Sequence, residues 1–172
     1  MPQAELLTDN YKEQQRQLHD SNDSYGTSSG IYKNEICSII TQVNPVDVVD
    51  YGCGKGLSKA FINKPLTLYD PCIAGRDTRP EPADMVICTD VLEHIEPELL
   101  NNVLDDLQRL TKKVGFFAIH TGPAKKVLSD GRNAHLIQEE YRWWLPRLWD
   151  RFDIMAYNRA GGGFYVIVGL KG

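Results

Sequence analysis

The sequence predicts a single α/β domain with a doubly wound, mostly parallel sheet and a C-terminal antiparallel hairpin. Short β-branched runs alternate with helical patterns along the chain, which indicates a sheet covered on both faces. The last two apolar runs are joined through the glycines at 161–163, as expected for a closing hairpin. The chain of 172 residues is long enough to bury one core without metal or disulfide staples.

The first 30 residues are expected to form an arm or lid, and residues 31–172 the domain itself. Residues 4–19 read as a polar, Gln-rich helix, and the Ser, Asn, Asp and Gly residues at 20–30 indicate a loop. We expect this arm to be draped over the domain and to close a pocket against water. Its candidate lid residues are Tyr11, His19, Tyr25 and Ser28.

Apolar spacing and chain breakers predict the elements of the domain in order. Helices are expected over residues 31–43, 91–111 and 134–150, the last interrupted near Pro146, with a helix start at 57–62. Strands are expected over residues 46–52, 66–70, 83–90 and 113–122 and in two segments of 152–171. The three tryptophans at 143, 144 and 149 are expected in the core or an interface, because adjacent aromatics on one helix point to different sides.

The stretch "VVDYGCGKG", residues 48–56, ends the first buried strand with three alternating glycines. In open parallel sheets the first strand-to-helix turn is the usual ligand contact, and glycines there let the backbone approach the ligand. The G-x-G-x-G spacing is one residue tighter than the dinucleotide pattern, and no GK[ST] sequence follows. A ligand without a pyrophosphate tail is therefore indicated.

Asp70 ends the next strand, 20 residues after Asp50. An acidic residue at that position accepts hydrogen bonds from the two hydroxyls of a ribose. Glycines without a phosphate signature, combined with a ribose acceptor, indicate a nucleoside such as S-adenosyl-L-methionine.

The segments "VVDYGCGKG", "LTLYDP" and "ADMVICTDVLEHIEPELL" closely resemble three motifs of the Rossmann-like, S-adenosylmethionine-dependent methyltransferases. The similarity extends over residues 46–169, and the whole chain also resembles short methyltransferase-like proteins of phages and prophages. The resemblance implies that the glycine turn faces the methionine and ribose, that Asp70 holds the ribose, and that the third segment lines the methyl-transfer pocket. The cofactor-binding residues implied in this way are Asp50, Gly52, Cys53, Gly54, Asp70, Pro71, Thr89 and Asp90.

The chain departs from this family between Asp70 and Ala83, where the segment is too short for the usual helix, strand and helix. One edge strand of the usual seven is expected to be missing. The adenine would then lie against residues 72–82 or residues 88–90. The 66–70 strand would become a sheet edge that needs a cover, and the arm is a candidate.

His94 and His120 are the candidate catalytic residues, because histidine titrates near neutral pH. His94 either orients the active-site loop or serves as a general base. His120 ends a parallel strand at the ligand edge and contacts substrate or acts as the base, unless it simply faces water. The plain alternative makes Asp90 a helix cap, Glu93 a solvated residue and His94 a buried polar contact. His135 and Asn133 close over the substrate, or Asn133 is only a turn residue.

The function predicted is transfer of a methyl group from S-adenosyl-L-methionine to an oxygen or nitrogen of a small-molecule acceptor. The alternatives are a protein that binds this cofactor without transfer, a nucleotide-sugar or dinucleotide enzyme, and a nucleic-acid methyltransferase. The net charge of −4 and the absence of a [DNS]PPY sequence disfavour nucleic acid as a partner.

Composition predicts no metal, membrane or disulfide. The four cysteines form no CxxC pair, and no apolar stretch suggests a signal segment or a membrane span. A cytoplasmic location is expected, and the sequence does not assign an oligomeric state.

Overall fold

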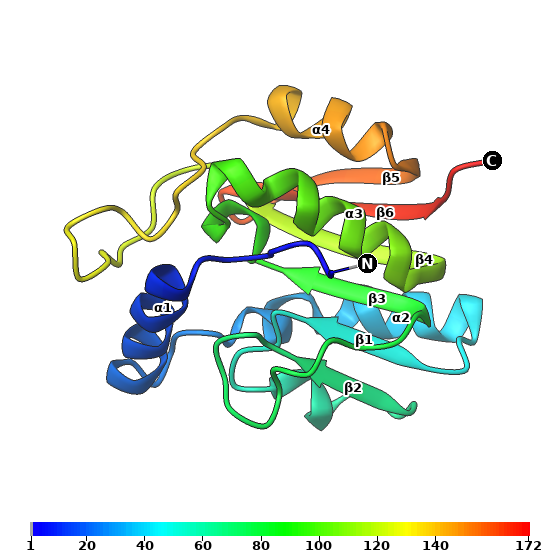
Figure 1. The fold of residues 1–172 in the computed structure, drawn as a ribbon. Coiled ribbons are helices and arrows are strands. Elements are labelled where there is room, and N and C mark those ends of the chain that lie inside the picture. The colour runs from blue at the N-terminus through cyan, green and yellow to red at the C-terminus, as the bar shows by residue number, and fades with distance from the viewer. Residues whose placement is uncertain (1) are drawn as a thin grey trace.

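The computed structural model describes residues 2–172 and contains one six-stranded mixed sheet (Figure 1). The strands run in the order β2-β1-β3-β4-β6-β5. The four parallel strands are β1 (Val48–Tyr51), β2 (Leu66–Tyr69), β3 (Ala83–Thr89) and β4 (Thr111–His120). The antiparallel hairpin consists of β5 (Phe152–Ala160) and β6 (Gly163–Leu170). The predicted α/β class, with its C-terminal hairpin, is confirmed.

The expected loss of one edge strand is also confirmed. Residues 71–82 contain no strand, and β2 is hydrogen-bonded only to β1 among the described strands. No backbone hydrogen bond joins residues 2–30 to β2, so the arm does not extend the sheet at this edge. The strand order reverses between β1 and β3, which is where ligands bind in sheets of this kind.

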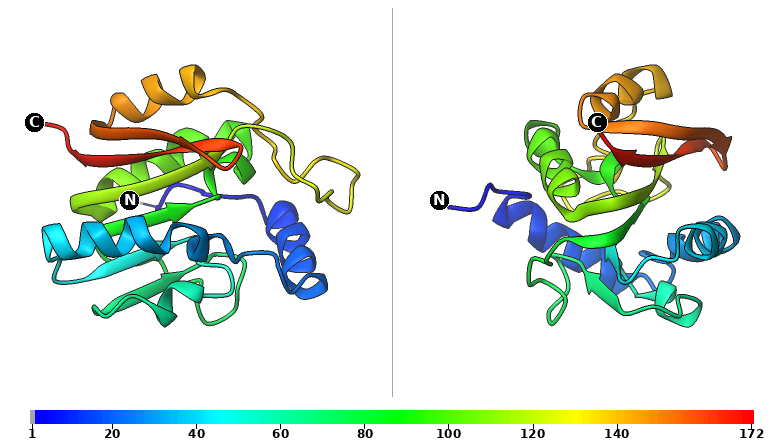
Figure 2. Two further views of the ribbon diagram at one scale, coloured as in Figure 1. Left: turned by 180° about the vertical axis from the view of Figure 1, so that it is seen from behind. Right: turned by 90° about the vertical axis from the view of Figure 1, so that its right-hand side faces the viewer.

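Helices cover both faces of the sheet (Figure 2). On one face α2 (Lys33–Val43) packs Ile36, Ile39 and Ile40 against β1, β3 and β4. On the other face α3 (Leu100–Leu110) and α4 (Tyr141–Trp149) bury their apolar sides in the larger core. Trp144 lies within that core, whereas Trp149 is largely exposed, so the expected core role holds for only part of the tryptophan cluster.

Three helix predictions need correction. After the glycine turn the chain forms only a short 3-10 turn at Leu57–Ala60. The helix expected from residue 91 begins only at Leu100, because Pro97 pushes the preceding residue into extended backbone. Residues 134–140 are not helical, since the Ala134 and Ile137 N–H groups donate to carbonyls of other segments. Pro146 lies within α4 rather than interrupting it.

The arm lies across the larger core and the carboxyl end of the sheet. Its helix α1 (Asp9–Ser21) starts later than predicted, after an extended segment that buries Leu6. Thr8 caps α1 by accepting from the Tyr11 N–H, and its own N–H and hydroxyl donate to the Glu96 carboxylate at 2.8 and 2.7 Å. The predicted arm includes Met1, which lies outside the described residues. No helix within residues 2–172 combines the length and apolar character needed to cross a membrane.

Candidate active site

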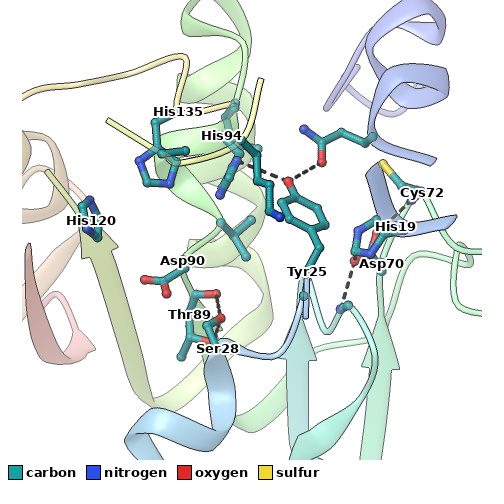
Figure 3. A pocket seen from close by; sticks show the side chains of 18 of the residues that line it. His19, Tyr25, Ser28, Asp70, Cys72, Thr89, Asp90, His94, His120 and His135 are labelled. Atoms are coloured by element: carbon teal, nitrogen blue, oxygen red, sulfur yellow. Dashed lines mark hydrogen bonds and ion pairs between the residues drawn. The ribbon is translucent and has the colours of Figure 1, made fainter. Parts of the chain in front are cut away.

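A cavity of about 490 Å³ lies at the carboxyl ends of β1, β2, β3 and β4, beneath the arm (Figure 3). This volume is within the range of small-molecule sites. Its walls come from the glycine turn, the loops after β2, β3 and β4, and the arm. The cavity is therefore lined by segments that are far apart in the sequence.

The glycine turn forms one wall and has no room for side chains. Gly52 and Gly54 have φ angles of 73° and 52°, in the region that favours glycine. A Cβ on Gly52 would meet the Val91 side chain at 2.3 Å, and one on Gly54 would meet the Gly26 carbonyl oxygen at 2.4 Å. The sequence forms this tight bend because only glycine fits both the dihedral angles and the close approach of the arm.

Asp70 faces the same cavity from the end of β2. One carboxylate oxygen accepts from the Gly54 N–H at 3.0 Å, and the other accepts from the Cys72 N–H at 2.9 Å. His19 Nε2 of the arm lies 4.0 Å from the carboxylate, and burial lowers the pKa of His19. The two backbone donors hold the carboxylate in a fixed orientation beside the turn.

Asp50 and Cys53 lie behind the turn rather than in the cavity lining. Asp50 is 1% exposed and accepts a hydrogen bond from the Ser58 hydroxyl. Burial raises the pKa of Asp50 to about 6 and that of Cys53 to about 12. Both residues thus support the turn from the interior.

Thr89 and Asp90 form the wall at the end of β3. Asp90 has a φ of 52°, a costly backbone conformation for a residue other than glycine. Burial raises its pKa to about 6, and the facing His120 opposes the rise. Ser28 of the arm donates to the Thr89 carbonyl oxygen at 2.9 Å, which ties the arm to this strand end.

His94 and His120 both line the cavity, but their surroundings differ. His94 Nδ1 lies 2.8 Å from the Ala134 carbonyl oxygen, and burial, reinforced by His135, lowers its pKa to about 3. A histidine that is neutral and held by the backbone fits the orienting role better than that of a general base. His120 ends β4 beside Asp90, and its N–H donates to Glu93 Oε1 at 3.0 Å.

A sequence model described as a methyltransferase domain matches residues 15–158 of the chain. The chain belongs to the methyltransferase domain family. The predicted enzyme class, with S-adenosyl-L-methionine as methyl donor, is thereby confirmed. No curated protein sequence matches the chain.

Solved structures share the fold over nearly the whole chain. The Burkholderia thailandensis 1,6-didemethyltoxoflavin-N1-methyltransferase, solved with its substrate and S-adenosylhomocysteine, has a TM-score of 0.66 and 15% identity, covering 99% of this chain and 91% of its own. The N-methyltransferase NodS of Bradyrhizobium japonicum, with S-adenosylhomocysteine, has a TM-score of 0.56 and 13% identity, covering 95% and 98%. The 16S rRNA methylase RmtB has a TM-score of 0.51 and 14% identity, covering 98% and 77%. At these identities the likeness shows the fold alone.

The structure brings most of the predicted site residues of this methyltransferase together. The predicted residues that line the cavity are Gly52, Gly54, Asp70, Pro71, Thr89, Asp90, His94 and His120. All four candidate lid residues of the arm line it as well. The Tyr25 hydroxyl donates to Gln15 at 2.7 Å, and its ring lies edge-on to His19 and His94. Tyr11 donates to the His94 carbonyl oxygen.

Several residues around the cavity were misjudged or missed from the sequence. Glu93 is fully buried rather than solvated, because the residues after β3 fold into a 3-10 turn under the loop after β4. Asn133 is a turn residue that bonds Ala124 and the His135 N–H, whereas His135 itself lines the cavity. Lys125 and Lys126 were not singled out, since no local pattern marks a loop lysine that reaches a site.

Proposed function

We propose that the cavity holds S-adenosyl-L-methionine with its ribose hydroxyls donating to Asp70 and its methionine portion against Gly52 and Gly54. The observation that carries this proposal is the fixed carboxylate of Asp70 beside a side-chain-free turn, both facing one cavity at the carboxyl ends of the strands. The confirmed family supports the same placement. Asp50 and Cys53 act on the cofactor only through the turn that they support.

The adenine is proposed to lie at the apolar end of the cavity, where the arm replaces the missing strand. This end is lined by Leu6, Leu7, Cys72, Ile95 and Val103. Of the loop at 72–82, only Cys72 reaches the cavity lining. An apolar slot between the arm and the loop after β3 suits the flat faces of a purine.

The acceptor is proposed to be a small molecule that presents an oxygen or nitrogen beside Asp90 and His120. A lone pair of that atom attacks the sulfonium methyl carbon, a new bond to carbon forms, and the carbon–sulfur bond breaks with its electrons passing to sulfur. The acceptor proton passes to His120 or Asp90, the latter with a pKa of about 6 that is suitable for a base near neutral pH. Lys125 and Lys126 at the rim favour an acceptor with an acidic group.

The arm, residues 1–30, is proposed to act as a lid that opens to admit the ligands. Tyr25 and Ser28 bond across the cavity to residues of the domain, so a closed arm excludes water from the sulfonium. A cavity of about 490 Å³ and a net charge of −4 favour a small acceptor over nucleic acid. A cytoplasmic location and the likeness to phage proteins stay predictions.

Incubation with methyl-labelled S-adenosylmethionine and fractions of cell extract tests this function. We expect label in one small-molecule fraction, together with S-adenosylhomocysteine, and a strong reduction of both products with Asp70→Asn at cofactor concentrations that do not saturate the variant. Asp77→Asn, an exposed substitution on the same loop, is the matched control and retains activity. Binding of the cofactor without a labelled acceptor or S-adenosylhomocysteine in any fraction would instead support a binding protein that transfers nothing.

A further inference from the structure

Three side chains converge next to the acceptor side of the cavity, and none of them is among the predicted cofactor contacts. Glu93 and His94 follow β3, and His135 belongs to the long loop after β4. Each offers one ligand atom, and these atoms lie within 4.8 Å of one another. The His94 and His135 rings are 4.7 Å apart between centroids and nearly perpendicular (Figure 3). This spacing suits donors that surround a common point.

In both imidazoles the Nδ1 atom is hydrogen-bonded to a backbone carbonyl oxygen. His94 Nδ1 lies 2.8 Å from the Ala134 carbonyl oxygen, and His135 Nδ1 lies 2.7 Å from the Gly122 carbonyl oxygen. A carbonyl oxygen only accepts, so each Nδ1 carries the proton and each Nε2 keeps a free lone pair. Metal-binding histidines are oriented in this way, with one nitrogen donating to a carbonyl and the other free for the ion.

Glu93 supplies an unpaired carboxylate oxygen at the same place. The side chain is fully buried, and Oε1 accepts from the His120 N–H at 3.0 Å. Oε2 is equally buried, and no group of residues 2–172 bonds to it. A buried carboxyl oxygen without a partner is rare and costly, because nothing replaces the water lost on folding, and the same burial raises the pKa of Glu93 well above its ordinary value. A cation between Glu93 and the two histidines would satisfy it.

We propose that Glu93, His94 and His135 bind one divalent transition-metal ion. Two imidazoles and one carboxylate form a donor set that suits Zn²⁺ or Fe²⁺ rather than Ca²⁺ or Mg²⁺. The ion has coordination positions left open toward the cavity, which His94 and His135 both line. The sequence predicted no metal because His135 is remote from the adjacent pair Glu93 and His94 and no ligand spacing links them.

The ion gives the acceptor side a definite chemical preference, and this step rests on the proposed function. A metal ion binds an oxygen of the acceptor and stabilises its deprotonated form, as it does with water. The acceptor class is then a hydroxyl compound, or one with two neighbouring hydroxyls that chelate the ion. An amine acceptor, whose lone pair the ion would occupy, is disfavoured.

Titration of the full chain, freed of metal by a chelator and of any histidine tag, with Co²⁺ tests the site. The visible d–d absorption of bound Co²⁺ reports coordination directly, without an activity assay. We expect one ion per chain at micromolar concentrations, displaced by Zn²⁺. Affinity should fall at least ~10-fold in Glu93→Gln and in His135→Ala. His19→Gln, which changes another buried histidine of the same cavity, should bind Co²⁺ like the wild type.

Absence of Co²⁺ binding to the wild type would overturn the proposal. Binding of Co²⁺ by Glu93→Gln and His135→Ala with the wild-type affinity would also overturn it. Far-UV circular dichroism checks folding, and His135→Ala on a loop keeps the test decisive if Glu93→Gln does not fold. Calorimetry with S-adenosylhomocysteine on the metal-free chain separates the two proposals. Cofactor binding without metal leaves the cofactor site intact whichever way the Co²⁺ result falls.

Discussion

The two ends of the cavity differ in how their polar groups are partnered. At the cofactor end, both oxygens of Asp70 accept backbone N–H groups, and the turn that donates one of them is free of side chains. At the acceptor end, Glu93 has an unpaired buried oxygen and Asp90 has a strained backbone. The turn and the Asp70 carboxylate at the cofactor end are therefore already held in place, and the buried atom without a partner there is His19 Nδ1, beside Asp70, whereas at the acceptor end it is a carboxyl oxygen, Glu93 Oε2.

Gly54→Ala should have the largest effect, because it adds a side chain to the glycine turn at the cofactor end. The added Cβ would lie 2.4 Å from the Gly26 carbonyl oxygen, in a left-handed conformation. We expect a loss of about 3 kcal/mol in the free energy of unfolding and no measurable binding of S-adenosylhomocysteine. Urea denaturation and calorimetry measure both.

Gly75→Ala is the matched control for Gly54→Ala. Gly75 has a φ of 83° but open space around its Cβ position, so it carries the backbone strain without the clash. Its stability should fall by only ~1 kcal/mol, with cofactor affinity retained. Equal behaviour of the two variants would mean that the close approach of the arm has no role.

His120→Gln should separate the two ends by slowing transfer alone. Loss of a general base lowers rates by about 100-fold, while the cofactor contacts are untouched. The rate of label transfer to the acceptor fraction measures the first effect, and calorimetry measures the second. An unchanged rate would leave Asp90 as the candidate base. A lower affinity for S-adenosylhomocysteine would mean that His120 also contributes to cofactor binding, so that the two ends are not independent.

Asp70→Asn should weaken the binding of S-adenosylhomocysteine by about 30-fold, which is the usual effect of losing a hydrogen bond to a charged group. The amide keeps one acceptor oxygen, so the turn retains part of its support. Isothermal calorimetry against Asp77→Asn gives the comparison. Equal dissociation constants for the two variants would remove Asp70 from the ribose site.

Asp50→Asn should have the smallest effect on binding, within about twofold, because Asp50 lies behind the turn. Its effect is on the pH dependence of stability. The folded pKa of about 6 exceeds the ordinary 3.8, so the folded state keeps a proton that the unfolded state releases between these values. Stability therefore falls as pH rises from about 4 to about 6, by up to ~1.4 kcal/mol per pH unit.

The amide introduced by Asp50→Asn does not titrate, so this component of the slope should disappear in the variant. Urea midpoints measured across that pH range check the difference. Slopes that match between the variant and the wild type would mean that Asp50 is ionised in the folded protein at pH values near its ordinary pKa.

The same contrast decides what the sequence could predict. The sheet and the cofactor end follow from contiguous signals: a β-branched strand, its glycines, and an aspartate at the end of the next strand. Even the missing strand is visible, because residues 71–82 are too few to form it. The helix boundaries near Leu57, Pro97 and Tyr141 were less predictable: short local turns replace the helix near the first two, and backbone hydrogen bonds from Ala134 and Ile137 to other segments prevent it before the third.

The acceptor end could not be predicted as a unit. Glu93 looks like a surface residue at the start of a helix, and only the packed loop after β4 buries it. His135 reaches His94 through turns fixed by Asn133 and by backbone bonds to Lys126 and Glu93. No spacing in the chain encodes these contacts. The sequence nevertheless pointed to the arm residues, because of their position in a polar arm that precedes the domain.

The most direct test of the central claim is a crystal structure of the chain with S-adenosylhomocysteine. The claim is that Asp70 and the Gly52–Gly54 turn together form the seat of the cofactor. The predicted result is a pair of ribose hydroxyls within about 3 Å of the Asp70 carboxylate oxygens, with the methionine portion against the turn and its sulfur facing Asp90. A nucleoside bound away from Asp70, or a turn closed off from the ligand by the arm, would contradict it.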